Sequence, residues 1–185
     1  KIPDMAILNI SGDVSFRAYL NGNFICQGPP NIGSDYEDKT PPQHWYFTTH
    51  DIKNNLIKGE NIIAVEVFSF DFVLSETTSG NGKFICNIDS AINQTFLSTN
   101  NLWKAELDTS YSSINNLLIF NSNSELSNWT KINYDDKNWS DASILDADKY
   151  QYLEQSQIQT PLKVKIEPTS VVKNYNNVEE IININ

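Results

Sequence analysis

Three groups of neighbouring acidic residues could supply catalytic carboxylates. They are Asp35, Glu37 and Asp38, then Asp135 and Asp136, and finally Glu179 and Glu180. Cleaving a glycosidic bond requires two carboxyl groups, about 5–5.5 Å apart in retaining enzymes and about 6.5–9.5 Å apart in inverting ones. Rigid elements hold such pairs, whereas these acids lie in an irregular loop, a turn pattern and the C-terminal tail. We therefore predict that the chain itself has no catalytic residue.

The same acids have structural interpretations. Asp135 and Asp136 are typical of a turn, because Asp side chains accept hydrogen bonds from neighbouring backbone amides. The acids of residues 35–38 could coordinate Ca²⁺ through their oxygens, but a solvated loop is the favoured interpretation. Glu179 and Glu180 are interpreted as surface charge. We predict no metal site and no cofactor, and no serine has the context of a catalytic nucleophile.

Aromatic side chains offer a different chemistry, the stacking of a sugar ring on an apolar face. Trp45 is the best candidate, because it stands beside His44 and Tyr46 at the end of a proline-rich stretch that contains Tyr36. If the chain binds carbohydrate, we predict that these four residues form the site. The alternative is that Trp45 packs in the core. We expect a packing role for the other three tryptophans, Trp103, Trp129 and Trp139.

The elements that would position these residues are β-strands. The apolar runs are short, rich in β-branched and aromatic residues, and bounded by Asn, Gly, Ser and Asp, which is typical of an all-β chain. Asn21-Gly22 lies between two such runs and predicts a two-residue type I′ hairpin turn, since both residues tolerate positive φ. Strands are predicted over residues 5–10, 14–20, 24–27, 45–49, 61–68, 83–88, 94–98, 103–107 and 117–120.

Two of these predictions concern position in the fold. Residues 61–68 are apolar on one face and mostly apolar on the other, which predicts a central strand covered on both sides. Asp51 is expected to be the N-cap of a one-turn helix over residues 52–56, which stops at Gly59. The regular spacing of strands and turns over about 150 residues favours an antiparallel β-sandwich or jelly roll.

The strand pattern also suggests how the chain is divided. Residues 28–44 and 70–82 are long irregular stretches, and loops of such length are either functional or disordered. From about residue 146 the pattern weakens, and residues 161–168 are typical of an extended segment leaving a domain. We predict a β-sandwich over residues 1–150, and a linker with the start of a following domain over residues 151–185.

Composition excludes several partners. The net charge is −10, from 13 basic and 23 acidic residues, so we expect neither nucleic acid nor an anionic membrane as a partner. No apolar run reaches the ~18 residues of a membrane span, and the sequence at Lys1 lacks the apolar core of a signal peptide, as a mature or excised fragment would. Cys26 and Cys86 lack metal-ligand spacing, and two buried thiols are favoured over a disulfide.

Six segments, in order, carry a family resemblance. They include Ala6-Ile7-Leu8-Asn9-Ile10 with the Asn21-Gly22 hairpin, Gln27-Gly28-Pro29, His44-Trp45-Tyr46-Phe47-Thr48-Thr49-His50-Asp51-Ile52, and then residues 99–104, 129–139 and 161–168. Together they resemble the galactose-binding-like β-sandwich near the N-terminus of bacterial α-L-rhamnosidases and related multidomain glycoside hydrolases. Residues 28–44 are longer than the corresponding link in that family, and residues 115–126 replace an acidic segment that is usual there.

The resemblance implies a fold and a function. The fold would be a galactose-binding-like jelly roll. The function would be that of a non-catalytic accessory domain, which acts in architecture and could also bind carbohydrate. The partner would be a downstream catalytic domain of the same polypeptide, whose parent would be a bacterial glycoside hydrolase, periplasmic or secreted rather than cytoplasmic. An independent carbohydrate-binding module and a ligand-free adhesion or spacer domain are the alternatives.

Overall fold

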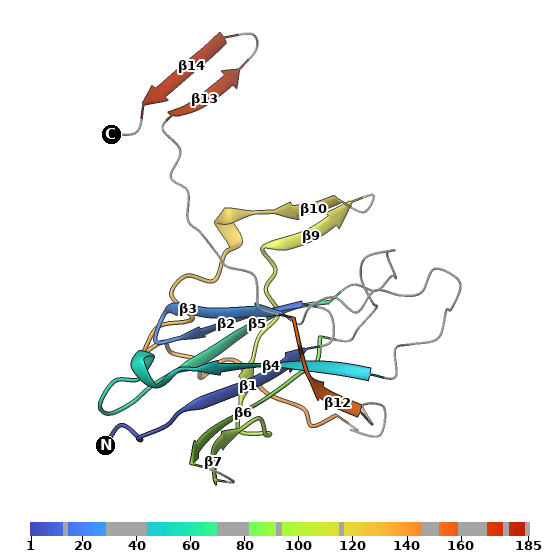
Figure 1. Ribbon diagram of the computed structural model, residues 1–185. Coiled ribbons are helices and arrows are strands. Elements are labelled where there is room, and N and C mark those ends of the chain that lie inside the picture. Colours follow the sequence, from blue (N-terminus) through green and yellow to red (C-terminus); the bar gives the residue numbers. More distant parts are fainter. Residues whose placement is uncertain are drawn as a thin grey trace.

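Two β-sheets with a shared apolar core form the body of the protein (Figure 1). The computed structural model describes residues 1–12, 15–28, 44–69, 82–91, 94–114, 117–145, 152–158, 170–175 and 178–183. Nearly all regular structure in these residues is β, and neighbouring strands run antiparallel with one exception described below. The prediction of an all-β antiparallel sandwich is therefore confirmed.

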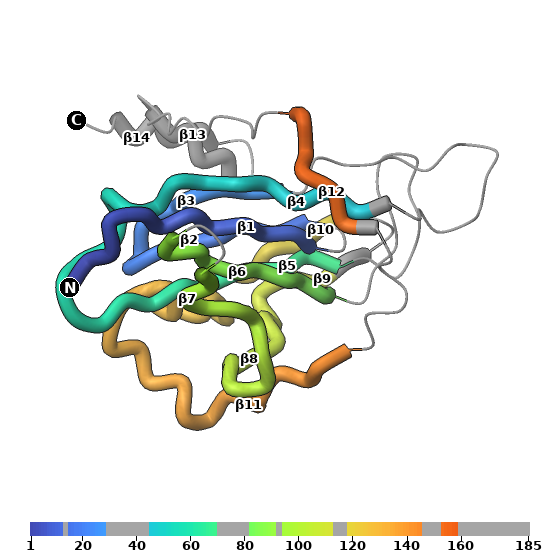
Figure 2. The backbone as a smooth tube through the Cα atoms, turned by 60° about the horizontal axis from the view of Figure 1, so that its bottom comes forward, coloured from blue at the N-terminus to red at the C-terminus, as the bar shows by residue number. Residues whose placement is uncertain are grey.

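The larger sheet has five strands in the order β12-β4-β1-β6-β7. Its centre is β1 (Ile7–Gly12), which pairs antiparallel with β4 (His44–Asp51) and with β6 (Phe84–Ala91). The edges are β7 (Gln94–Ser98), antiparallel to β6, and β12 (Tyr152–Gln155), parallel to β4. Figure 2 looks onto the outer face of this sheet, with β1 between β4 and β6.

The smaller sheet has three strands in the order β3-β2-β5. They are β3 (Asn23–Gly28), β2 (Ser15–Leu20) and β5 (Ile63–Phe68), and β2 pairs antiparallel with both neighbours. The prediction that residues 61–68 form a central strand is wrong for the described residues, because β2 is central there and β5 lies at the edge. The apolar pattern of β5 has another cause: Val65 and Val67 pack on the core, while the opposite face is covered by side chains from later in the sequence.

The core lies between the sheets and follows the alternation of the strands. Leu8 and Ile10 point inward from β1, and Phe16, Ala18 and Leu20 point inward from β2, all at most 2% exposed. Cys26 of β3 and Cys86 of β6 join this cluster from opposite sheets as free, buried thiols. Burial raises the pKa of each thiol to about 12, so both stay protonated at neutral pH. This confirms the interpretation of the cysteines as small apolar side chains.

The hairpin between β2 and β3 turns at Asn21 and Gly22, as predicted. Their φ angles are 54° and 83°, the positive values that a type I′ turn requires. The Asn21 side chain also accepts a hydrogen bond from the backbone N–H of Ile62 at 3.0 Å. The turn is therefore held from outside the hairpin as well as by its own geometry.

Shorter elements complete the described residues. The predicted helix at 52–56 is a 3-10 turn, η1 (Lys53–Asn55), with Ile52 in the N-cap position, although Asp51 Oδ1 does accept a bond from Lys53 N at 3.0 Å. The predicted strand 103–107 shortens to β8 (Lys104–Ala105). The remaining elements are β9 (Tyr111–Ile114), β10 (Leu117–Phe120), η2 (Ser122–Ser124), β11 (Ser140–Asp141), β13 (Ser170–Tyr175) and β14 (Val178–Asn183).

Two of these elements bear on the predicted boundary at residue 150. Strand β12 begins only two residues beyond it and belongs to the five-stranded sheet. Strands β13 and β14 pair with each other, and in the described residues neither pairs with a strand of the two larger sheets (Figure 1). An isolated two-stranded hairpin is at best marginally stable in water. The assignment of this hairpin to a following domain stays a prediction.

Candidate functional site

The residues predicted to bind carbohydrate lie at the start of β4, with one exception. His44, Trp45 and Tyr46 are its first three residues, whereas Tyr36 lies outside the described residues, as do Asp35, Glu37 and Asp38. Trp45 is 8% exposed, which leaves little ring surface on which a sugar could stack. The backbone carbonyl of Tyr46 accepts a bond from Ser11 Oγ at 2.7 Å, which ties β4 to β1.

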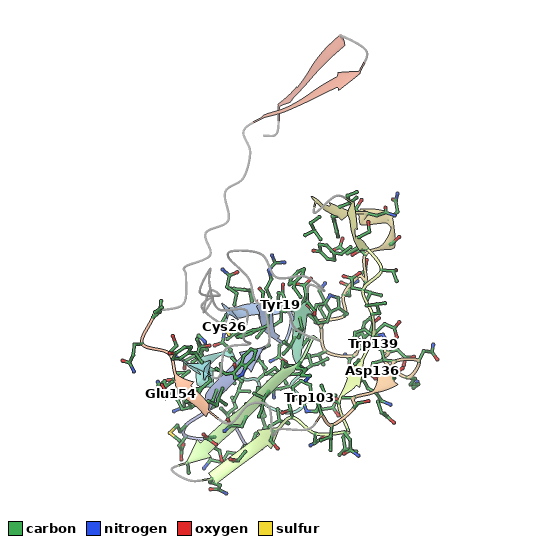
Figure 3. The ribbon with its side chains drawn as sticks, turned by 90° about the vertical axis from the view of Figure 1, so that its right-hand side faces the viewer. Tyr19, Cys26, Trp103, Asp136, Trp139 and Glu154 are labelled. Atoms are coloured by element: carbon green, nitrogen blue, oxygen red, sulfur yellow. The ribbon has the colours of Figure 1, made fainter. Side chains whose placement is uncertain are left out.

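Asp135 has the structural role expected of it, and Asp136 lies in the same turn and takes part in it through its backbone carbonyl. Asp135 Oδ1 accepts a bond from the backbone N–H of Lys137 at 3.3 Å, and the Asp136 carbonyl accepts one from Trp139 N at 2.9 Å. Trp139 packs edge-on against Tyr134. Figure 3 shows Asp136 and Trp139 at the opposite side of the view from Glu154 of β12. This turn therefore lies away from β12.

A groove of about 410 Å³ lies on the outer face of the five-stranded sheet. We call it the outer groove. The outward-pointing residues of four strands line it: Ile7, Asn9 and Ser11 of β1, Phe47 and Thr49 of β4, Ile85, Asn87 and Asp89 of β6, and Leu153 and Gln155 of β12. On β1 and β6 these positions alternate with core residues such as Leu8, Ile10, Cys86 and Ile88.

A chain of side-chain hydrogen bonds runs across the groove, and we call it the polar row. Gln155 Nε2 donates to Thr49 Oγ1 at 3.4 Å, and Thr49 Oγ1 donates to Asn9 Oδ1 at 2.9 Å. Asn9 Nδ2 in turn donates to Asp89 Oδ2 at 3.1 Å. The Oδ1 atom of Asp89 accepts from Asn87 Nδ2 at 2.8 Å and from Thr95 Oγ1 at 2.9 Å. The row thus links all five strands of the sheet.

Hydrocarbon lies beside the polar row. Ile85 precedes Asn87 by two residues on β6, and Phe47 precedes Thr49 by two residues on β4. Ile85 and Leu153 are 53% and 42% exposed. The floor of the groove therefore combines a strip of apolar surface with a strip of amide, hydroxyl and carboxylate groups.

A second hollow of about 320 Å³ adjoins the first and shares Thr49 and Gln155 with it. It is completed by Thr48, His50 and residues 156–158, which follow β12. His50 Nε2 lies 3.0 Å from Thr48 Oγ1, and burial lowers the pKa of His50 below its ordinary value. The imidazole is therefore neutral at neutral pH and adds no positive charge beside the groove.

The charged and polar groups of the outer groove limit the chemistry that its described residues offer. Asp89 is the one carboxylate among the described residues that line the outer groove, and glycoside hydrolysis requires a pair. What remains is a set of amide and hydroxyl groups with fixed orientation beside an apolar strip, the composition of a small-molecule binding site.

No residue that lines the outer groove is among the site residues predicted from the sequence. A usable signal was present: Asn9 alternates with Leu8 and Ile10, and Asn87 and Asp89 alternate with Cys86 and Ile88. Such alternation predicts polar side chains on an outer sheet face. It does not say which strands lie side by side, so the row could not be assembled from it.

Comparison with known proteins supports the fold. No protein-family model and no curated protein matches the chain. Among solved structures, the crystal structure of a GH78 family rhamnosidase of Bacillus sp. GL1 is similar, with a TM-score of 0.66 and 18% identity. The match covers 86% of this chain and 17% of that one. The chain is thus an all-β sandwich similar in fold to a portion of a much longer glycoside hydrolase.

In the described residues, no helix is both long and apolar enough to cross a membrane.

Proposed function

We propose that this chain is a non-catalytic accessory domain of a larger glycoside hydrolase related to the α-L-rhamnosidases. The observation that carries the proposal is the structural likeness to a GH78 family rhamnosidase. The match covers 86% of this chain but only 17% of the rhamnosidase. A galactose-binding-like jelly-roll topology and a catalytic domain following β13 and β14 are parts of the same proposal.

The described side chains support a non-catalytic role. The carboxylate of Asp135 and the backbone carbonyl of Asp136 are bonded within a turn, and among the described residues the outer groove offers a single carboxylate, Asp89. The contribution of such a domain would be architectural: it would brace the catalytic domain and could extend its substrate-binding surface.

The test is hydrolysis of 4-nitrophenyl α-L-rhamnoside and of the corresponding galactosides. We expect no turnover by residues 1–185, and turnover of one of these substrates by the polypeptide that contains the chain. Turnover by residues 1–185 that disappears in Asp136→Asn or Asp89→Asn would overturn the proposal. A parent polypeptide without glycosidase activity would overturn the assignment to a glycoside hydrolase.

Carbohydrate binding is a second candidate function, and the outer groove favours it over a ligand-free spacer. The predicted site of Trp45, His44, Tyr46 and Tyr36 has less support, because the ring of Trp45 is nearly enclosed. The groove is a few residues away on the same strand and is open.

A further inference from the structure

We propose that the outer groove binds a neutral saccharide, with the polar row contacting its hydroxyl groups and the adjacent apolar strip contacting its ring carbons. The inference rests on the proposed function, since it names the ligand of an accessory domain, and it assigns the contacts to residues other than Trp45 and its neighbours.

The polar row is oriented before any ligand arrives. Gln155 donates to Thr49, Thr49 to Asn9 and Asn9 to Asp89, so the donors all point the same way along the sheet. Asp89 ends the chain and accepts three bonds in all. Side chains held in this way lose little conformational freedom when a ligand binds, which is the main advantage of preorganisation.

The row keeps unused hydrogen-bonding capacity that faces the groove. A primary amide has two N–H donors and an oxygen with two lone pairs. In the described part of the chain, Asn9 uses one donor and accepts one bond, and Asn87 uses one donor. Each can therefore donate and accept once more. Sugar hydroxyl groups also donate and accept, so they match both capacities of the same side chain.

The apolar strip lies at the right place for a sugar ring. Alternate residues of a strand lie about 7 Å apart, so Phe47 and Ile85 run parallel to Thr49 and Asn87 at that spacing. A pyranose carries C–H groups on its faces and hydroxyl groups on its rim. It can cover the hydrocarbon strip while its hydroxyl groups reach the row.

The size and charge of the groove limit the class of saccharide that it can bind. The volume of about 410 Å³ falls within the ~300–1,000 Å³ of typical ligand sites, which suits one or two sugar units. Asp89 places a negative charge in the groove of a chain with a net charge of −10. Uronic acids and sulfated sugars would be repelled, so the groove is suited to a neutral saccharide.

The experiment is a binding titration of residues 1–185 with neutral oligosaccharides containing rhamnose, galactose or glucose, and with oligogalacturonate of matched length. Binding is followed by calorimetry and by the ¹⁵N NMR signals of the side-chain amides. We expect a neutral oligosaccharide to bind, and to shift the signals of Asn9, Asn87 and Gln155.

Matched variants locate the site. Thr49→Val removes a hydroxyl that lines the groove, whereas Thr109→Val changes an exposed threonine that belongs neither to the groove nor to the polar row. The loss of one hydrogen bond predicts an affinity about fivefold lower in Thr49→Val and about unchanged in Thr109→Val. Circular dichroism and melting temperature confirm that both variants fold.

Four results would overturn the inference: no binding of any neutral sugar, equal affinity in Thr49→Val and wild type, tighter binding of oligogalacturonate, or shifts confined to residues outside the groove. A fifth is protection of the groove amides from exchange in the longer polypeptide without sugar, because a neighbouring domain would then occupy the site. None of these outcomes contradicts the proposed function, because that proposal is tested by the glycosidase activity of the parent polypeptide.

Discussion

The outer faces of the two sheets are built in opposite ways. On the three-stranded sheet, Tyr19 packs edge-on against Phe24 and Trp129, with ring centroids 6.0 and 5.7 Å apart. Phe68 contacts Tyr111 in the same manner at 5.4 Å. On the five-stranded sheet the outward positions carry the polar row and an open groove. One face is closed by later parts of the chain, and the other is left open to solvent.

The difference is consistent with the proposal that one face serves structure and the other binding. Aromatic rings such as Tyr19 and Trp129 gain stability by removing apolar area from water. A row of amides gains little stability on a surface, because water would satisfy the same groups. Its organisation across five strands therefore supports the proposal that it binds a ligand.

The largest expected effect is on the closed face. Tyr19→Ala removes the ring that joins β2 to Trp129, and we expect a loss of about 3 kcal/mol in the free energy of unfolding, measured in urea. Tyr19→Phe keeps the ring and should cost less than about 1 kcal/mol. A loss in Tyr19→Ala no larger than in Tyr19→Phe would show that the closed face is not a packing surface.

The core shared by both faces should respond to alkaline pH. Burial raises the pKa of Cys26 and Cys86 to about 12, whereas the thiols of the unfolded chain ionise near their ordinary value of 9.0. The unfolded state therefore releases protons that the folded state keeps, and stability falls as pH rises from about 9 towards 12. We expect a loss of about 3 kcal/mol between pH 8 and pH 10 from the two thiols together. Urea unfolding of a Cys26→Ala/Cys86→Ala variant, which should lack most of this loss, separates it from other titrations.

The hairpin turn at Gly22 lies against Lys131, in a later part of the chain. Gly22 has a φ of +83°, and a Cβ placed there would lie 3.2 Å from Lys131 Cγ. Gly22→Val should lower stability by about 1–3 kcal/mol, because a β-branched residue is strained at positive φ. Gly22→Asn should cost clearly less, since Asn tolerates this conformation. Equal melting temperatures for the two variants would contradict the strain argument.

Arg17 makes a smaller contribution to the closed face. Its guanidinium lies 5.0 Å from the centroid of Phe68 and 3.3 Å from a carboxylate oxygen of Glu66. Arg17→Met keeps the apolar stem and should cost about 0.5–1 kcal/mol. Glu66→Gln removes the ion pair but keeps the contact between Arg17 and Phe68. It should therefore lower the free energy of unfolding less than Arg17→Met does, and equal losses would show that the contact with Phe68 contributes nothing. Chemical unfolding at low and high salt measures both.

The smallest effect on stability is expected on the open face. Thr49→Val breaks the polar row at its middle, but the side chain is exposed, so we expect a change of less than about 0.5 kcal/mol in the free energy of unfolding. The same variant is the one expected to weaken saccharide binding. A large loss of stability would mean that the row serves the fold, and the contrast between the two faces would fail.

The structure confirms most of what local patterns predicted. The positive φ angles of Asn21 and Gly22 follow from their own chemistry. The alternation of Leu8 and Ile10 with Asn9 is a property of one strand, and Leu8 and Ile10 are buried in the structure while Asn9 is less so. Predictions made from single segments were therefore accurate, apart from element ends such as those of β8 and η1.

Predictions that needed pairing between distant strands were less successful. Apolar residues on both faces of β5 suggested a central strand, but covering side chains such as Tyr111 gave the same pattern at an edge. Nothing in the sequence around Gln155 indicated a parallel strand beside β4. The Trp45 site stays a prediction, drawn from neighbours in the sequence, whereas the groove is made of residues from four strands.

The sequence by itself determined the class of fold, the hairpin at Asn21-Gly22 and the residues that face the core, because each depends on contacts within a few residues. Only the tertiary structure decided which strands adjoin and in which register. Asn9 and Asp89 are 80 residues apart, and Thr49 and Gln155 are 106 apart. Their hydrogen bonds exist because β1, β4, β6 and β12 pair in one register, and a shift of a single residue would turn these side chains to the opposite face.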